Sequence, residues 1–123
     1  MSGNWLRLSK RLGLYLRDGM ACVYCQRPSH HALGQDGFSV DHVIPRDGGN
    51  NQAANLVMCC TKCNSSKKDR DLEEWLGSPR CPAVGTPAEV LMRVLQATTT
   101  PLKPHRKAAR LILVAHGYDP KYI

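Results

Sequence analysis

The sequence has no run of 18 or more apolar residues, so no segment is long enough to cross a membrane as a helix. Residues 1–11 also lack the apolar stretch of a secretory signal peptide. These absences predict a cytoplasmic protein, in which thiols stay reduced. Phenylalanine occurs once, and an apolar fraction of 42% supports only a modest core, so we expect the 123 residues to form a single domain.

Acidic residues are outnumbered by basic ones, 10 against 17, which gives a formal net charge of +7. Such an excess fits a polyanionic partner, although charge alone does not identify one. Lys and Arg are spread along the chain without a separate basic tail, and no internal repeat or low-complexity tract is present.

Four of the six cysteines form two Cys-x-x-Cys pairs with thirty-four residues between them: Cys22, Cys25, Cys60 and Cys63. Two intervening residues let both thiolates turn onto one ion, and four sulfurs complete a closed tetrahedral site for structural zinc. Disulfides fit a reducing compartment poorly, and two redox pairs around one loop would be unusual. We expect Cys59 to be a small buried hydrophobe and assign Cys81 no role.

The N-terminal region predicts one helix and one knuckle. Residues 4–17 have the apolar spacing of an amphipathic helix that ends near Gly19. Its basic face either touches phosphates or is solvated: Arg7, Lys10, Arg11 and Arg17. The first cysteine pair follows within residues 20–27. In the polar loop 28–37, His30 and His31 are extra ligands, phosphate contacts or, more simply, solvated residues.

The central region predicts a strand, a loop, a strand and a helix, over residues 38–42, 45–54, 56–59 and 61–68. Beyond it the pattern is helical. Asp71 and Glu74 can cap a short helix that stops at Gly77, and Thr86 and Glu89 form a capping box that opens a helix to about Gln96.

A last helix is expected over residues 105–116. Its inward face is predicted to be apolar: Ala108, Leu111, Ile112 and Ala115. A basic cluster is expected on the other side: Lys103, Arg106, Lys107 and Arg110.

The central residues have the types that phosphodiester hydrolysis requires. A histidine can deprotonate water near neutral pH, and a hard divalent cation prefers carboxylate and amide oxygens. Asp41 and His42 are adjacent on a predicted strand, so their side chains point to opposite faces unless the strand ends there. A bend at His42, which Pro45 and Gly48-Gly49 favour, would relieve this conflict, and Asn64 can return to the same place from the following helix.

Together these elements resemble the four-cysteine zinc subgroup of the HNH endonucleases. The resemblance is carried, in order, by Cys22-x-x-Cys25, Val40-Asp41-His42-Val43-Ile44-Pro45, Gly48-Gly49, Asn55-Leu56 and Cys60-x-x-Cys63-Asn64-x-x-Lys67. It spans about residues 17–70. It implies an α+β fold with a small ββα-metal core held together by zinc, an N-terminal helix over residues 4–17 and a C-terminal helical extension over residues 71–123.

The resemblance also implies the catalytic roles. His42 corresponds to the general base, and Asp41 and Asn64 to the ligands of a catalytic magnesium or manganese ion. Asn64 replaces the final histidine of the family's name, and its amide oxygen suits these ions better than zinc. Asn55 matches the middle residue of the catalytic motif, which braces the loop through hydrogen bonds to the backbone.

The implied substrate is DNA, which would be nicked or cut through both strands. Lys67, Lys68 and Arg46 are candidate phosphate contacts, with a solvated surface as the alternative. The family suggests a phage or mobile-element context, with a homodimer or a packaging enzyme as candidate partners. The competing hypothesis is a zinc-bound nucleic-acid-binding module without activity. A toxin or restriction component ranks lower, because the sequence has no partner-binding motif.

Overall fold

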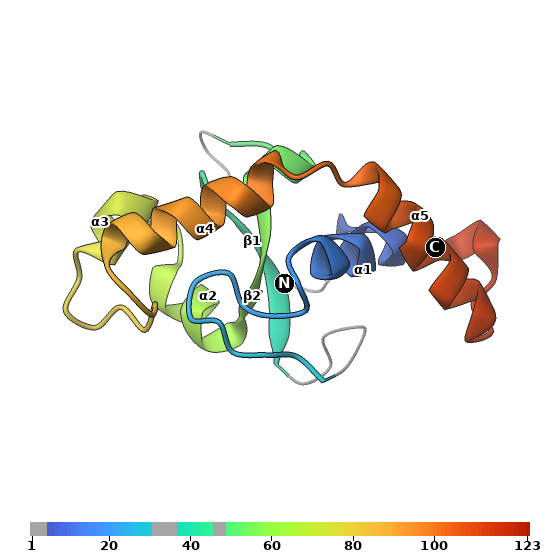
Figure 1. Cartoon of the computed structure of the whole chain (residues 1–123), viewed down its shortest axis with the longest axis horizontal. Coiled ribbons are helices and arrows are strands. Elements are labelled where there is room, and N and C mark those ends of the chain that lie inside the picture. Colours follow the sequence, from blue (N-terminus) through green and yellow to red (C-terminus); the bar gives the residue numbers. More distant parts are fainter. Residues whose placement is uncertain (1–4, 31–36, 46–48) are drawn as a thin grey trace.

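The computed structural model describes residues 5–30, 37–45 and 49–123 (Figure 1). His31 and Arg46, named above as candidate site residues, lie outside the described residues. The elements follow in the order α1 (Leu8–Arg17), β1 (Phe38–His42), the 3₁₀ turn η2 (Ala53–Asn55), β2 (Leu56–Cys60), α2 (Thr61–Lys67), α3 (Leu72–Leu76), α4 (Pro87–Thr99), α5 (Lys103–Ala115) and the 3₁₀ turn η3 (Pro120–Tyr122). Helices around a small sheet confirm the predicted α+β class.

The sheet consists of β1 and β2, which pair antiparallel with Phe38 opposite Cys60 and His42 opposite Leu56. Every residue of β2 is buried, because α1, α2 and α4 all contact this strand. A short continuous apolar run without polar alternation is what a strand covered on both faces requires. β2 therefore forms the centre of the core, and α2 follows it directly in the ββα order that the sequence predicted.

Arg17 corrects the prediction for the basic face of the first helix. The α-helix begins at Leu8 and ends at Arg17, whose side chain is buried instead of reaching phosphate or solvent. Its Nε pairs with Asp18 Oδ1 at 2.7 Å, and its Nη1 donates to the Ala53 carbonyl at 2.8 Å. Asp18 in turn accepts from the Met58 amide at 2.8 Å. This pair fixes α1 to β2. The contacts join residues about 40 positions apart in the sequence, and the periodicity of one helix carries no information on such distant partners.

The capping predictions had mixed outcomes. Thr86 and Glu89 form both bonds of the capping box at the start of α4. This helix continues beyond Gln96 to Thr99, and the Thr99 hydroxyl bonds the Leu95 carbonyl one turn back, at 2.7 Å. For α3 the helix, the N-cap residue Asp71 and the stop at Gly77 were predicted correctly, but the Asp71 side chain makes no capping bond.

The predicted inward face of the last helix was only partly right: Ile112 packs against the core, but Ala108, Leu111 and Ala115 are exposed. Ala109 and Leu113 are buried in α5, whereas Leu111 is 70% exposed. The helix is rotated from the expected orientation because it packs against α1 through Arg106 at Gly13. A Cβ added to Gly13 would lie 2.9 Å from the Arg106 Cα, so only glycine permits this close approach.

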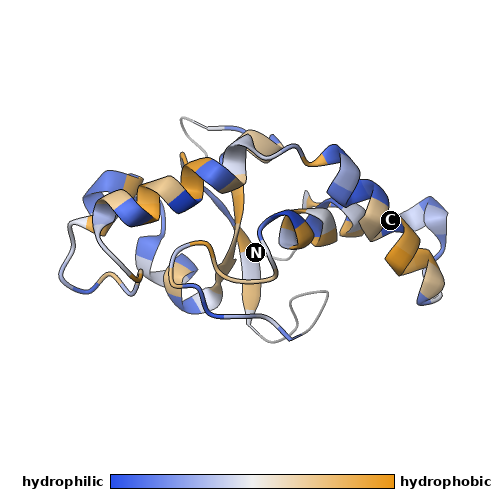
Figure 2. Ribbon diagram, viewed as in Figure 1, coloured by the Kyte–Doolittle hydropathy of each residue, from blue (hydrophilic) through white to orange (hydrophobic). Residues whose placement is uncertain are grey.

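Apolar segments recur along the ribbons of α4 and α5 (Figure 2). Five large apolar residues of these two helices are exposed: Leu91, Met92, Leu95, Leu111 and Val114. Within the described part of the chain, no helix combines the length and the apolar character needed to cross a membrane.

We predict that Gly13→Ala destabilises the protein by about 1 kcal/mol or more, because overpacking against the α5 backbone outweighs the better helix propensity of alanine. Urea unfolding measures the effect. The control is Gly77→Ala, whose Cβ would meet its nearest neighbour at 3.6 Å, an ordinary contact. Equal stability of the two variants would show that α1 and α5 are not packed this closely.

Candidate active site

The four cysteines of the two pairs come together in one cluster. Their Sγ atoms all lie within 4.8 Å of one another, and the Sγ atoms of Cys25 and Cys60 are 3.6 Å apart. Four sulfurs at about 2.3 Å from one zinc ion would be about 3.8 Å apart in a regular tetrahedron. The donor set and its spacing therefore fit a closed structural zinc site.

Backbone geometry supports the same assignment. Cys60 ends β2 and caps α2, and its Sγ accepts from the Cys63 amide at 3.4 Å. The Cys22 Sγ accepts from the Cys25 amide at the same distance. These matched N–H···S bonds shape both turns so that their thiols face one point. Cys59 is fully buried, as predicted for a hydrophobic role.

Asp41 is held from two sides by buried polar groups. Its Oδ2 accepts from the Tyr24 hydroxyl at 2.6 Å and lies 3.1 Å from the Lys67 Nζ. Burial raises the pKa of Asp41, while the Lys67 charge and both hydrogen bonds oppose that rise. Both partners contact Oδ2, so Oδ1 accepts no hydrogen bond within the described part of the chain. No side-chain N or O atom in that part is fully buried without a hydrogen-bond partner, so Oδ1 is not fully buried. Oδ1 is therefore the oxygen that meets solvent.

Lys67 corrects a sequence prediction. It was expected to touch phosphate, but its side chain is fully buried at the end of α2. Its Nζ pairs with Asp41 and also donates to the His42 carbonyl at 2.9 Å. A buried lysine needs such partners, because an uncompensated ammonium in the core is costly. Lys68, the next residue, is exposed and retains its predicted access to a ligand.

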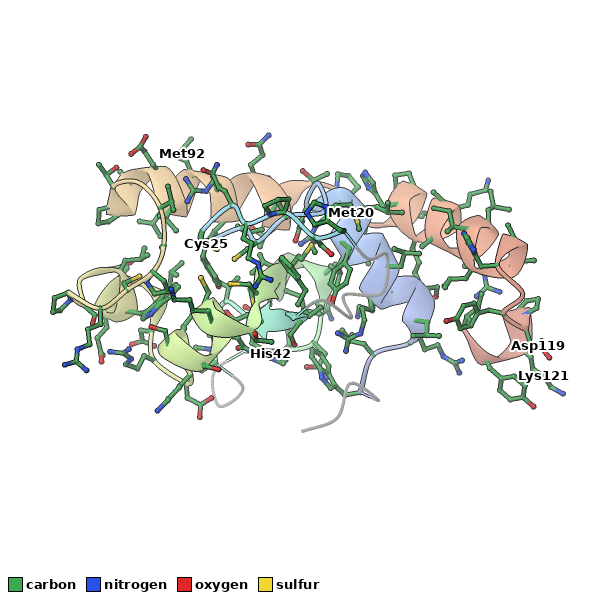
Figure 3. The ribbon with its side chains drawn as sticks, turned by 90° about the horizontal axis from the view of Figure 1, so that it is seen from below. Met20, Cys25, His42, Met92, Asp119 and Lys121 are labelled. Carbon is green, nitrogen blue, oxygen red and sulfur yellow. The ribbon has the colours of Figure 1, made fainter. Side chains whose placement is uncertain are left out.

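His42 is the last residue of β1, where the chain leaves the strand ladder. Its half-buried imidazole stacks on the Trp5 ring with centroids 4.9 Å apart and planes at 22°. Its Nε2 lies 2.7 Å from the Asn51 Oδ1. Figure 3 shows His42 well separated from Cys25, so the imidazole is not part of the sulfur cluster.

Asn55 braces the loop beyond His42. Its Oδ1 accepts from the Ile44 amide at 2.8 Å, and its Nδ2 donates to the carbonyls of Ile44 at 3.1 Å and Asn50 at 2.9 Å. The backbone approaches so closely here that a Cβ on Gly49 would lie 2.3 Å from the Ile44 carbonyl oxygen. The brace fixes the segment that presents Asn51 to the imidazole.

Asn64 lies on α2 directly after Cys63 and is half-buried. Its side-chain amide makes no hydrogen bond within the described residues, so its oxygen is available to a ligand. Because α2 contacts β1, the knuckle brings this residue toward the strand that carries Asp41. His30 is exposed and lies outside the sulfur cluster.

A model of the HNH endonuclease family matches residues 22–70, which include both knuckles, the sheet and α2. Residues 22–70, which we call the HNH core, therefore match the HNH endonuclease family. Over 77 residues the chain is 34% identical to the CRISPR-associated endonuclease Cas9 of Actinomyces naeslundii, covering 61% of this chain and 7% of that protein. Over 61 residues it is 33% identical to the CRISPR-associated endonuclease Cas9 of Corynebacterium diphtheriae, covering 48% and 5%.

The solved structures agree with the sequence comparison. The crystal structure of the Type II-C Cas9 enzyme from Actinomyces naeslundii matches with a TM-score of 0.59 and 28% identity. The match covers 85% of this chain and 11% of that one. It therefore extends beyond the HNH core into the flanking helices, while the chain spans only a small part of these relatives.

Sequence reasoning missed three residues that contact Asp41 or His42: Tyr24, Asn51 and Trp5. A buried hydroxyl between two cysteines of the sulfur cluster gives no periodic signal. The pair Asn50-Asn51 beside Gly48-Gly49 was the one available hint, because asparagine side chains often bond within such loops.

We predict that Cys63→Ser unfolds the HNH core, because structural zinc in small domains contributes about 10–16 kcal/mol to folding. Thermal unfolding and metal analysis of the purified protein measure the effect. Cys81→Ser is the control, since Cys81 lies outside the sulfur cluster. Zinc-free native protein, or equal melting of the two variants, would contradict the zinc assignment.

Proposed function

We propose that the HNH core hydrolyses phosphodiester bonds in DNA, with His42 as the general base and Asp41 and Asn64 as oxygen ligands of magnesium or manganese. One observation carries this proposal. At the end of β1 the Asp41 carboxylate is held through Oδ2 alone, and the imidazole of the next residue, His42, is held through Nε2. The family match to HNH endonucleases supports a nuclease, and the excess positive charge fits DNA.

His42 is oriented for proton abstraction. An amide oxygen only accepts hydrogen bonds, so the bond to Asn51 Oδ1 requires the proton on Nε2. The neutral ring then carries its lone pair on Nδ1, which can take a proton from water. Stacking on Trp5 restricts the ring to this orientation.

Tyr24 and Lys67 act as positioning residues for Asp41. Both bind Oδ2, which leaves Oδ1 as the oxygen for the cation, and the lysine charge favours the ionised carboxylate despite its burial. The Asn64 amide oxygen would supply the second ligand, which is neutral. A bound divalent cation would stabilise charge on the scissile phosphate, and Lys68 and Arg46 remain proposed contacts to neighbouring phosphates.

The alternative function is a nucleic-acid-binding module without hydrolysis. Its specific support is the Trp5 ring, which covers one face of the His42 imidazole. Both functions use the same scaffold and both include DNA binding. They differ in whether the protein cuts DNA and whether that cutting requires His42.

We predict that His42→Ala lowers plasmid nicking in magnesium or manganese by about 10²–10⁴-fold, the usual contribution of a general base, while DNA binding persists. His116→Ala is the matched control, because His116 is exposed at the C-terminal end of α5. Equal nicking by wild type and His42→Ala would remove the base assignment, and absence of nicking in both would favour the binding module.

We predict that Tyr24→Phe keeps its zinc but binds manganese about 10–100-fold more weakly, because partners that orient a metal ligand typically contribute this much. Electron paramagnetic resonance measures manganese binding, and metal analysis checks zinc. The control Tyr122→Phe removes a hydroxyl from an exposed ring. Unchanged manganese affinity in Tyr24→Phe would show that its hydroxyl does not orient the Asp41 carboxylate.

A further inference from the structure

The charges of this chain are separated along its length. Residues 5–17 and 90–118, which include α1 and α5, contain no acidic side chain. Four of the ten acidic residues are instead concentrated at positions 69–74, around α3. Figure 1 places α3 and α5 at opposite ends of the molecule. Residues 68–80 around α3 carry four acidic and three basic side chains and are nearly neutral, whereas α5 carries four basic side chains and no acidic one.

Packing of α5 against α1 gathers basic side chains into one surface. Arg106 crosses α1 at Gly13 and donates from its Nε to the Ser9 hydroxyl at 3.1 Å. The four basic residues of α5 recur at helical spacing and therefore share one side of that helix. We call this surface the basic ridge: Lys10, Lys103, Arg106, Lys107 and Arg110.

The fold holds these like charges close together. Burial, and then the charge of Arg106, lower the pKa of Lys10. The ion pairs among the described residues are Arg17–Asp18 and Lys67–Asp41, and neither includes a member of the basic ridge. Like charges without acidic partners destabilise a fold slightly, and a polyanion bound along them removes that penalty.

The basic ridge continues directly from the candidate active site. Lys10 Nζ donates to the Asn51 carbonyl at 2.7 Å, and the Asn51 side chain contacts His42 Nε2 at 2.7 Å. From Lys103 to Arg110 the helix rises about 10 Å at 1.5 Å per residue. One strand of B-DNA places about three phosphates along that length, at 3.4 Å each.

We propose that the basic ridge binds the phosphate backbone of duplex DNA beside the cut site and so orients the duplex over His42. The proposal rests on the proposed function for the identity of the polyanion. Phosphate contacts position a protein on DNA without reading the base sequence of the DNA, so the ridge contributes affinity and register but no base preference. It also gives the α5 extension, which lies outside the HNH core, a role in substrate binding.

The test measures the salt dependence of binding to a labelled duplex of 30 base pairs, by fluorescence anisotropy. All proteins carry His42→Ala, so the duplex stays intact. Lys103→Gln/Lys107→Gln removes two exposed charges and should reduce the slope of log K against log salt by about 1.8, or about 0.9 per lost phosphate contact. Arg80→Gln, exposed near α3, is the control and should leave the slope unchanged.

Each outcome separates this proposal from the nuclease assignment. An unchanged slope in Lys103→Gln/Lys107→Gln overturns the basic ridge, even if wild type nicks DNA through His42. A reduced slope supports the ridge, even if wild type does not nick. Vesicles containing phosphatidylserine form a second arm. If the double substitution abolishes vesicle binding and leaves the DNA slope intact, the ridge binds an anionic lipid surface and the DNA proposal fails.

Discussion

The convergence of four sulfurs on one point is the constraint on which the rest of this structure depends. It joins a turn near the N-terminus to the junction of β2 and α2, which are otherwise separated by thirty-four residues. Tyr24 comes from inside the first turn, and Lys67 from the end of the helix that the second turn begins. Both reach the same carboxylate oxygen of Asp41. A structural metal centre thereby also determines the orientation of a candidate catalytic ligand.

The arrangement around Asp41 shows why a strongly basic residue is buried here. Removing one partner of a buried ion pair leaves an uncompensated charge and typically costs about 3–5 kcal/mol. Lys67 thus has a stabilising role through Asp41 and a positioning role through the His42 carbonyl. Its place in the motif is explained by its two partners inside the HNH core, so the proposed phosphate contacts are left to exposed side chains such as Lys68.

Local and cysteine-based patterns predicted much of this molecule. The two strands, the capping box of α4 and the sulfur cluster each depend on residues close in sequence or on one strong chemical preference, so their signals are direct. The failures at Arg17 and in α5 involve packing between distant segments, whereas the missing Asp71 capping bond and the later end of α4 are local. Arg17 looked like a surface residue because its carbonyl partners at Ala53 and Leu56 lie across the chain. The orientation of α5 was missed because Gly13, on another helix, selects the face that packs.

The site followed the same division. The types of residue at positions 41, 42 and 64 came from the motif, and the geometric conflict between adjacent strand residues was visible in advance. The separate partners of the two side chains were not visible. The Asp41 carboxylate contacts Tyr24 and Lys67. The His42 imidazole, at the end of β1, contacts Asn51 in the segment that Asn55 braces. Once that brace is formed, the same loop offers its Asn51 side chain to the imidazole and its Asn51 carbonyl to Lys10. A single loop residue therefore connects the candidate base to Lys10 of α1, the helix that packs against α5. The proposed chemistry and the proposed substrate orientation would thus depend on the same loop.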